Sequence, residues 1–186
     1  MTAATSAQSP IDEIVSIANN LPTLEKLCSD FTQMVTVIDK KDQSPTIHAL
    51  QAMTALAENS MLTAQAYLIS NLPAALNACG DKKSTAETRA AAELAVKTIC
   101  DKISPNALRE VLPHLFAALD SSCKWQTRVA ALKAIASFGD HAPEQLSHAL
   151  PDVIPEVSKC VVELKKEVCE AAEKAMVAVC DVVGNR

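Results

Sequence analysis

The sequence predicts an all-α protein built from antiparallel helix pairs that repeat about every 41 residues. Its composition argues against a β fold. Aromatic residues make up 3% of the chain and there are three glycines, fewer than barrels and sandwiches need for strands and turns. Alanine and leucine dominate the apolar 49% instead, and both favour helix. Within each segment, apolar residues recur three or four positions apart, as on one face of a helix.

Two sequence markers recur in phase along the chain. Lysines in short polar breaks lie 42, 41 and 41 residues apart, at Lys41, Lys83, Lys124 and Lys165. Three of the breaks are preceded by a Leu/Ile-Pro pair: Leu72-Pro73, Leu112-Pro113 and Ile154-Pro155. Each proline is followed by apolar residues at helical spacing. Proline within a helix is expected to kink it. A period of about 40–47 residues with two helices per repeat is typical of HEAT and armadillo arrays.

The second helix of each repeat is expected after its polar break. Apolar residues at helical spacing run through four such segments, from Ile47 to Ala57, Thr85 to Ile99, Trp125 to Ala136 and Val168 to Val179. The pairs Ser44-Pro45 and Ser104-Pro105 predict an N-cap followed by proline at the first helical position. Gly139 and Gly184 are predicted to mark helix ends.

These elements predict a HEAT-repeat right-handed superhelical solenoid of stacked antiparallel helix pairs, with a compact helical bundle as the alternative. Residues 1–20 are expected to form a flexible tail and a cap helix. About four repeats follow over residues 21–186, with approximate bounds 21–61, 62–103, 104–141 and 142–186. The last repeat ends without a polar capping unit after it, which suggests that the array is truncated at its C-terminus.

Charge and cysteine content narrow the class of protein. The net charge is −5 and the pI is about 5.4, which argues against bulk nucleic-acid affinity but leaves local basic patches open. The seven cysteines form no C-x-x-C pair, so we expect free thiols in the core and a reducing, cytoplasmic location. No signal peptide is recognisable, and no stretch reaches the roughly 20 apolar residues of a membrane span.

Several segments resemble one family of repeat proteins. The stretch Pro105 to Leu115, the turn Lys124-Trp125-Gln126, the stretch Leu150 to Val157 and the turn Lys165 to Val168 are together similar to the N-terminal HEAT region of fungal-type translation elongation factor 3. The similarity runs from about residue 42 to the end. The giant HEAT-repeat translational activator of general amino-acid control resembles the same region. The two turns are the specific parts, since the Leu-Pro pattern belongs to HEAT repeats generally.

The resemblance implies a function in translation. It implies a non-catalytic domain that docks a parent ATPase of the ABC class on the ribosome, touching small-subunit ribosomal RNA and ribosomal proteins. The parent's cassettes would bind ATP and magnesium, whereas this chain contains no G-x-x-x-x-G-K-[ST] loop. Its residues offer no catalytic, cofactor or metal site. The alternative is a general protein-interaction scaffold, such as a transport or regulatory adaptor, that binds a protein or peptide.

The candidate partner-binding residues lie in the breaks between the helices of each pair. In a stacked array the same phase recurs along one edge, so a basic ridge is predicted there from Lys41, Lys82, Lys83, Lys124, Lys165 and Lys166, with Lys40 beside them. Acids that include Asp81 and Asp120 flank the ridge, and exposed lysines that only aid solubility are the simpler interpretation.

Two further predictions concern the same edge. Trp125, the only tryptophan, is expected to pack between repeats or to anchor an interface. Asp81 with Arg89, and Asp120 with Arg128, are spaced eight residues apart and are predicted to link neighbouring repeats through their side chains.

Overall fold

The computed structural model describes residues 21–59 and 61–184, and this part of the chain is helical without strands. Its elements are α2 (Leu21–Thr36), α3 (Ser44–Asn59), α4 (Met61–Gly80), α5 (Ala86–Lys102), the 3-10 helix η1 (Pro105–Ala107), α6 (Leu108–Leu119), α7 (Trp125–His141), α8 (Pro143–Val161) and α9 (Lys166–Gly184). The predicted tail and cap helix of residues 1–20 lie outside the described residues. The all-α prediction is confirmed.

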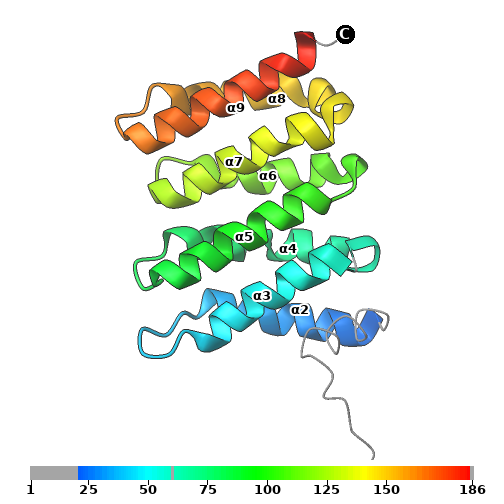
Figure 1. The fold of residues 1–186 in the computed structure, drawn as a ribbon, viewed down its shortest axis with the longest axis vertical. Coiled ribbons are helices and arrows are strands. Elements are labelled where there is room, and N and C mark those ends of the chain that lie inside the picture. Colours follow the sequence, from blue (N-terminus) through cyan, green and yellow to red (C-terminus); the bar gives the residue numbers. More distant parts are fainter. Residues whose placement is uncertain (1–20, 60, 185–186) are drawn as a thin grey trace, which may run out of the picture.

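The helices form four antiparallel pairs stacked in one direction (Figure 1). In each pair we call the first helix the A helix (α2, α4, α6, α8) and the second the B helix (α3, α5, α7, α9). A helices contact A helices and B helices contact B helices along the stack, which gives two layers. Neighbouring B helices touch more extensively than neighbouring A helices, and from this we infer that the stack curves toward the B layer. This is the predicted solenoid, and the alternative of a compact bundle is wrong.

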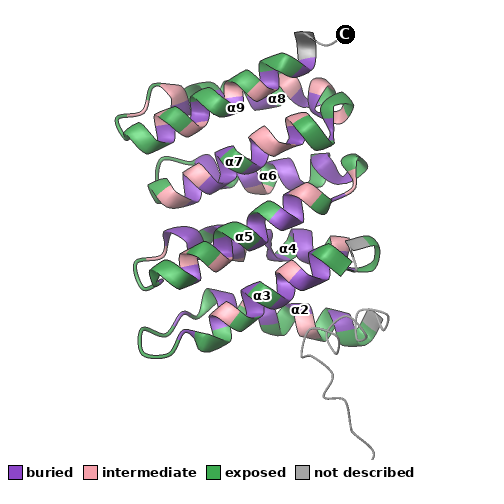
Figure 2. Ribbon diagram, viewed as in Figure 1, coloured by how far each residue is buried: buried purple, intermediate pink, exposed green. Residues whose placement is uncertain are grey.

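The core runs without interruption through the whole stack. Buried residues line the contacts within pairs and between pairs, while the outer faces and most turn residues are exposed (Figure 2). Successive B helices each bury a pair of alanines: Ala92 and Ala95 in α5, Ala131 and Ala134 in α7, and Ala172 and Ala175 in α9. Because alanine is short, it allows the backbones of these helices to approach closely.

Three local expectations are corrected by the structure. Ser44 is the first residue of α3 rather than its N-cap, because the Gln43 carbonyl accepts the first helical hydrogen bond from Ile47. Ser104 is an N-cap followed by Pro105 at the first helical position, as predicted, but the helix is a 3-10 helix and the Ser104 side chain makes no capping bond. Gly139 lies inside α7, which continues to His141.

The prolines lie inside A helices as predicted, at Pro73, Pro113 and Pro155, but the residue before each proline is not equivalent in the three repeats. Leu72 and Leu112 are buried, whereas Ile154 is 39% exposed. Val153 is buried in its place. Since neighbouring residues are about 100° apart around a helix, a shift of one position turns a side chain away from the core.

Buried polar side chains tie each pair to the next. The Gln43 amide donates to the Lys83 carbonyl (2.6 Å) and accepts from the Thr85 N–H (2.9 Å) and the Thr88 hydroxyl (2.6 Å). These three bonds join the first A–B connection to the second. They also give the buried Gln43 amide its partners, so they fix the register of the two pairs.

We expect that replacing Gln43 with alanine lowers the free energy of unfolding by about 2–3 kcal/mol, because three partners in the next repeat lose their bond at once. Urea unfolding followed by circular dichroism measures this loss. Gln51→Ala, at an exposed position of α3, is the control and should change stability by less than about 0.5 kcal/mol. Equal effects of the two substitutions would contradict the proposed link.

A second stability prediction concerns Gly80, which ends α4. A methyl group there would collide with the Thr127 hydroxyl and lie 2.7 Å from Lys124 Cβ. Thr127 cannot easily move, since its hydroxyl donates to the Leu76 carbonyl (3.0 Å). Gly80→Ala should therefore cost about 1–3 kcal/mol, seen as a lower urea midpoint.

Gly139→Ala is the matched control for Gly80→Ala. Its new methyl group would lie 3.2 Å from the Ala178 carbonyl oxygen, a milder contact. The helix preference of alanine, about 1 kcal/mol over glycine, offsets that contact. A Gly80→Ala protein at least as stable as Gly139→Ala would mean that α4 and α7 are not as close as described.

Candidate functional site

The four A–B connections lie along one edge of the stack, the left edge in Figure 1. They span residues 37–43, 81–85, 120–124 and 162–165. The stacking places every predicted lysine at this edge: Lys41 in the first connection, Lys82 and Lys83 in the second, Lys124 in the third, Lys165 in the fourth and Lys166 at the start of α9. All six are exposed.

A groove of about 810 Å³ crosses the first three connections. We call it the lysine groove, because its lining includes Lys40, Lys82, Lys83 and Lys124 and only one acid, Asp81. The C-terminal end of α4, closed by Gly80, forms its floor. Lys41, Lys165 and Lys166 do not line it. The structure thus gathers half of the six predicted lysines, together with Lys40, into one concave basic surface.

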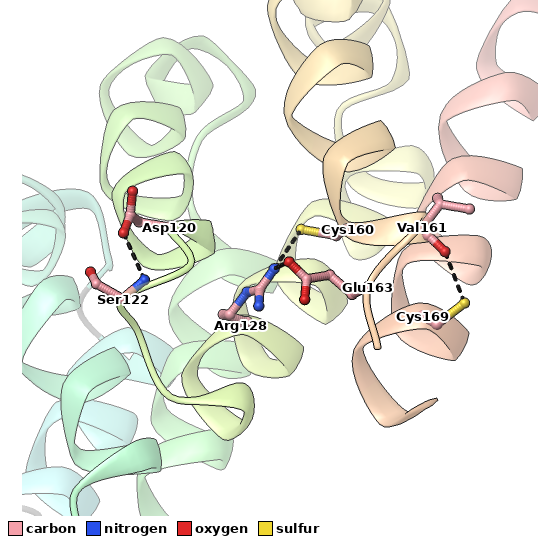
Figure 3. Close-up of polar contacts among 7 residues, drawn as sticks. All are labelled: Asp120, Ser122, Arg128, Cys160, Val161, Glu163 and Cys169. Carbon is pink, nitrogen blue, oxygen red and sulfur yellow. Dashed lines mark hydrogen bonds and ion pairs between the residues drawn. The ribbon is translucent and has the colours of Figure 1, made fainter. Parts of the chain in front are cut away.

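Acidic side chains at this edge bind the backbone of their own connection. Asp39, Asp81 and Asp120 each accept a hydrogen bond from the N–H two residues later, at 3.0, 2.7 and 2.8 Å. The Asp120–Ser122 bond is drawn in Figure 3. Hydrogen bonds from Ser122 lower the pKa of Asp120, so this carboxylate stays ionised.

These local bonds change the predicted roles of Asp81 and Asp120. Both were expected to link neighbouring repeats, and both instead stabilise a turn within one repeat. Arg89 also stays within its repeat, donating to the Asp81 carbonyl (3.2 Å). Among the described residues, the four lysines of the groove form no ion pair. The groove therefore keeps its positive charge.

Arg128 does link two repeats, through a partner that the sequence did not indicate. Its side chain is 8% exposed and donates to Glu163 (2.6 Å) in the fourth connection and to Cys160 Sγ (3.6 Å) in α8 (Figure 3). The bond from Arg128 lowers the pKa of Glu163, and the same bond raises the pKa of Arg128. Glu163 follows Arg128 by 35 residues, less than one full repeat, so the periodicity alone did not pair them.

The fourth connection differs from the first three. Trp125 begins α7 and is 38% exposed, with Lys165 Nζ 5.0 Å from the centre of its ring. Lys165 also pairs with Glu167 at 3.3 Å, and Lys166 pairs with Glu170 at the same distance. Val162 is 82% exposed and Leu164 is fully exposed. This end of the edge combines an aromatic ring with apolar side chains, and its lysines are neutralised by acids.

The seven cysteines are free thiols. Cys28, Cys79, Cys100 and Cys160 are buried. Burial raises the pKa of Cys28 to about 11 and the pKa values of Cys79 and Cys100 to about 12, so these thiols stay protonated and act as small core residues. In residues 21–59 and 61–184, no helix combines the length and the apolar character needed to cross a bilayer.

The ion pair between Arg128 and Glu163 predicts a pH-dependent contribution to stability. The folded-state pKa of Glu163 lies below its ordinary value of 4.5, so the contribution is present above pH 4.5 and is lost as the pH falls through the folded-state pKa. Glu163→Gln should therefore unfold at lower urea concentration than the wild type at pH 7, and the two midpoints should converge in acid. Glu110→Gln, on the exposed face of α6, is the control. A difference that is the same at both pH values would contradict the pair.

Comparison with known proteins identifies the family to which this chain is similar. The family model described as EF3 N-terminal HEAT repeat matches residues 11–176. Elongation factor 3 of Phytophthora infestans is 44% identical over 121 residues, which cover 65% of this chain and 12% of that protein. Elongation factor 3A of Saccharomyces cerevisiae is 32% identical over 148 residues, covering 78% of this chain and 14% of that protein.

Solved structures agree with the fold. The crystal structure of an engineered protein matches 94% of this chain and 68% of the engineered chain with a TM-score of 0.52 and 15% identity.

The chain spans between about an eighth and a seventh of the length of the two elongation factors. With a family model that covers most of its residues and relatives that share its sequence at this level, the chain belongs to the EF3 N-terminal HEAT repeat family.

Proposed function

We propose that this chain is the ribosome-docking domain of an elongation factor 3-like translation factor in the cytoplasm. Its role is to hold the factor on ribosomal RNA and ribosomal proteins of the small subunit during elongation. Membership of the family supports the link to translation. The observation that carries the docking role is the lysine groove, where four lysines from three repeats line one concavity with a single acid.

Electrostatics allow this role despite the net charge of −5. At physiological salt, charges separated by more than about 8 Å are largely screened, so a phosphate in the groove responds mainly to the lysines around it. Stacked helices lie about 8–10 Å apart, so two steps along the stack carry the groove roughly 20 Å. That length can hold several consecutive phosphates of one nucleic-acid strand.

The chemistry of the factor is assigned to another part of it. The chain corresponds to a small fraction of its relatives' length, and its sequence holds no phosphate-binding loop. We therefore place ATP hydrolysis, with its magnesium, in cassettes outside this domain. The domain itself acts by binding alone.

Charge reversal in the groove tests the docking role. The triple variant Lys82→Glu, Lys83→Glu and Lys124→Glu should weaken binding of the 186-residue chain to purified small subunits at least about tenfold at 0.1 M salt. The slope of the logarithm of the binding constant against the logarithm of the salt concentration should become shallower by about two. Co-sedimentation over a salt series measures both. The loss follows from removed phosphate contacts and from added repulsion.

A triple variant with the same net charge is the control for this experiment. Lys26, Lys102 and Arg109 are exposed and lie on helices outside the groove. Their reversal to glutamate should change binding by no more than about twofold. Equal losses in the two triple variants would mean that total charge, not the groove, governs binding. Binding unaffected by either variant would reject the groove as the docking surface, and a wild-type chain that does not bind small subunits would reject the docking proposal.

A second candidate function rests on the B layer. A groove of about 450 Å³ lies between α5 and α7, and Leu94 is 55% exposed there. Its lining is mainly apolar, with Leu94, Val96 and three alanines, and Glu93, Lys97 and Lys133 also contribute. Such an apolar cleft suits a peptide or helix of a protein partner, as in a general scaffold. This candidate predicts a salt-tolerant protein complex that Leu94→Glu disrupts and the groove reversals leave intact.

A further inference from the structure

The lysine groove and Trp125 lie next to each other at the edge of the stack. Lys124 lines the groove and Trp125 follows it directly as the first residue of α7. The tryptophan does not line the groove, and it is not enclosed by the core, since 38% of it is exposed. A partly exposed aromatic residue thus directly follows, in the chain, a lysine of the basic concavity.

Contacts to the fourth connection hold the tryptophan in place. Lys165 Nζ lies over the ring at 5.0 Å from its centre. The same Nζ forms an ion pair with Glu167 Oε1 at 3.3 Å, which fixes the position of Lys165. Three residues further along α7, Arg128 is fixed by Glu163 of the same connection. A ring held in this way loses little freedom when a ligand binds, which favours its use as a contact.

We propose that Trp125 stacks against an unpaired base of a single-stranded RNA segment whose phosphates occupy the lysine groove. This inference rests on the proposed function, and it goes beyond it by naming the kind of RNA and the residue that contacts its bases. Proteins that bind single strands commonly combine a basic groove for the backbone with an aromatic side chain for the bases. Both parts are adjacent here.

The surroundings favour RNA over an acidic protein as the partner. An acidic peptide would satisfy the lysines but would leave the exposed part of the indole ring in water. A nucleic-acid strand would use both features, because a base can cover the part of the ring that Lys165 leaves exposed, while phosphates of the same strand bind the lysines of the groove. The exposed Leu164 and Val162 offer further apolar surface to a base or sugar at the same end.

Fluorescence of the full chain tests the inference directly, since Trp125 is the only tryptophan. We expect a 12-nucleotide single-stranded oligoadenylate to quench this emission, because a stacked base quenches indole. Inorganic polyphosphate and polyglutamate of similar charge should bind the groove without that quenching. The same oligoadenylate in a duplex with oligouridylate should also quench little, because its bases are paired.

Affinity measurements on variants complete the test. By anisotropy of a labelled oligoadenylate, Trp125→Ala should weaken binding about 5- to 150-fold, whereas Trp125→Phe should keep most of the affinity. Polyphosphate binding should be the same in all three proteins. The triple reversal of Lys82, Lys83 and Lys124 to glutamate should weaken the binding of both the oligoadenylate and polyphosphate.

The possible results separate the inference from the proposed function. If the groove reversals weaken RNA binding but Trp125→Ala does not, stacking is wrong and the groove remains a phosphate site. If polyglutamate binds as tightly as the oligoadenylate and quenches as much, the surface fits an acidic protein and the RNA assignment is overturned. If neither RNA nor polyphosphate binds the wild-type chain, both the inference and the groove's role fail.

Discussion

Each helix pair of this protein buries its apolar face only by packing against the next pair. Small residues make that packing close: alanines recur in the buried faces of the B helices, and Gly80 lets the start of α7 sit against the end of α4. Every other feature depends on this contact. The curve of the stack, the alignment of the A–B connections and the position of each surface side chain all follow from how tightly one pair seats on another.

Polar bonds between the pairs turn this apolar stacking into a fixed register. Gln43 joins the first two A–B connections, Thr127 bonds the carbonyl of Leu76, and Arg128 reaches the fourth connection through Glu163. Each bond is buried or half-buried and would be costly to leave unmade. Since the connections cannot slide past each other, lysines from three repeats meet in one groove. The aspartates of the same connections satisfy their own backbone and leave the lysines unpaired.

The edge therefore has two chemically different ends. Its first three connections form a basic groove, and its fourth carries exposed apolar residues beside a tryptophan. On the proposed function, such a divided edge suits a partner surface that carries both phosphates and unpaired bases better than a uniform ridge would. The apolar cleft between α5 and α7 lies on another face of the solenoid, so binding at the edge and binding at the B layer are compatible.

The helical fold, the repeat and the edge on which the lysines lie could all be predicted from the sequence, because periodicity and turn composition are local properties that every repeat shows in its own residues. The sequence did not determine which side chains meet across repeats. Arg128 has Glu163 rather than Asp120, Ile154 faces water where Val153 is buried, and Gly139 serves close packing rather than a helix end. These contacts became visible in the three-dimensional arrangement of the helix pairs. The same arrangement brings Lys40, Lys82, Lys83 and Lys124 into one groove and places Lys165 over Trp125. Contacts between pairs depend on distances and rotations of a fraction of a helical turn, which a spacing of about 41 residues does not specify.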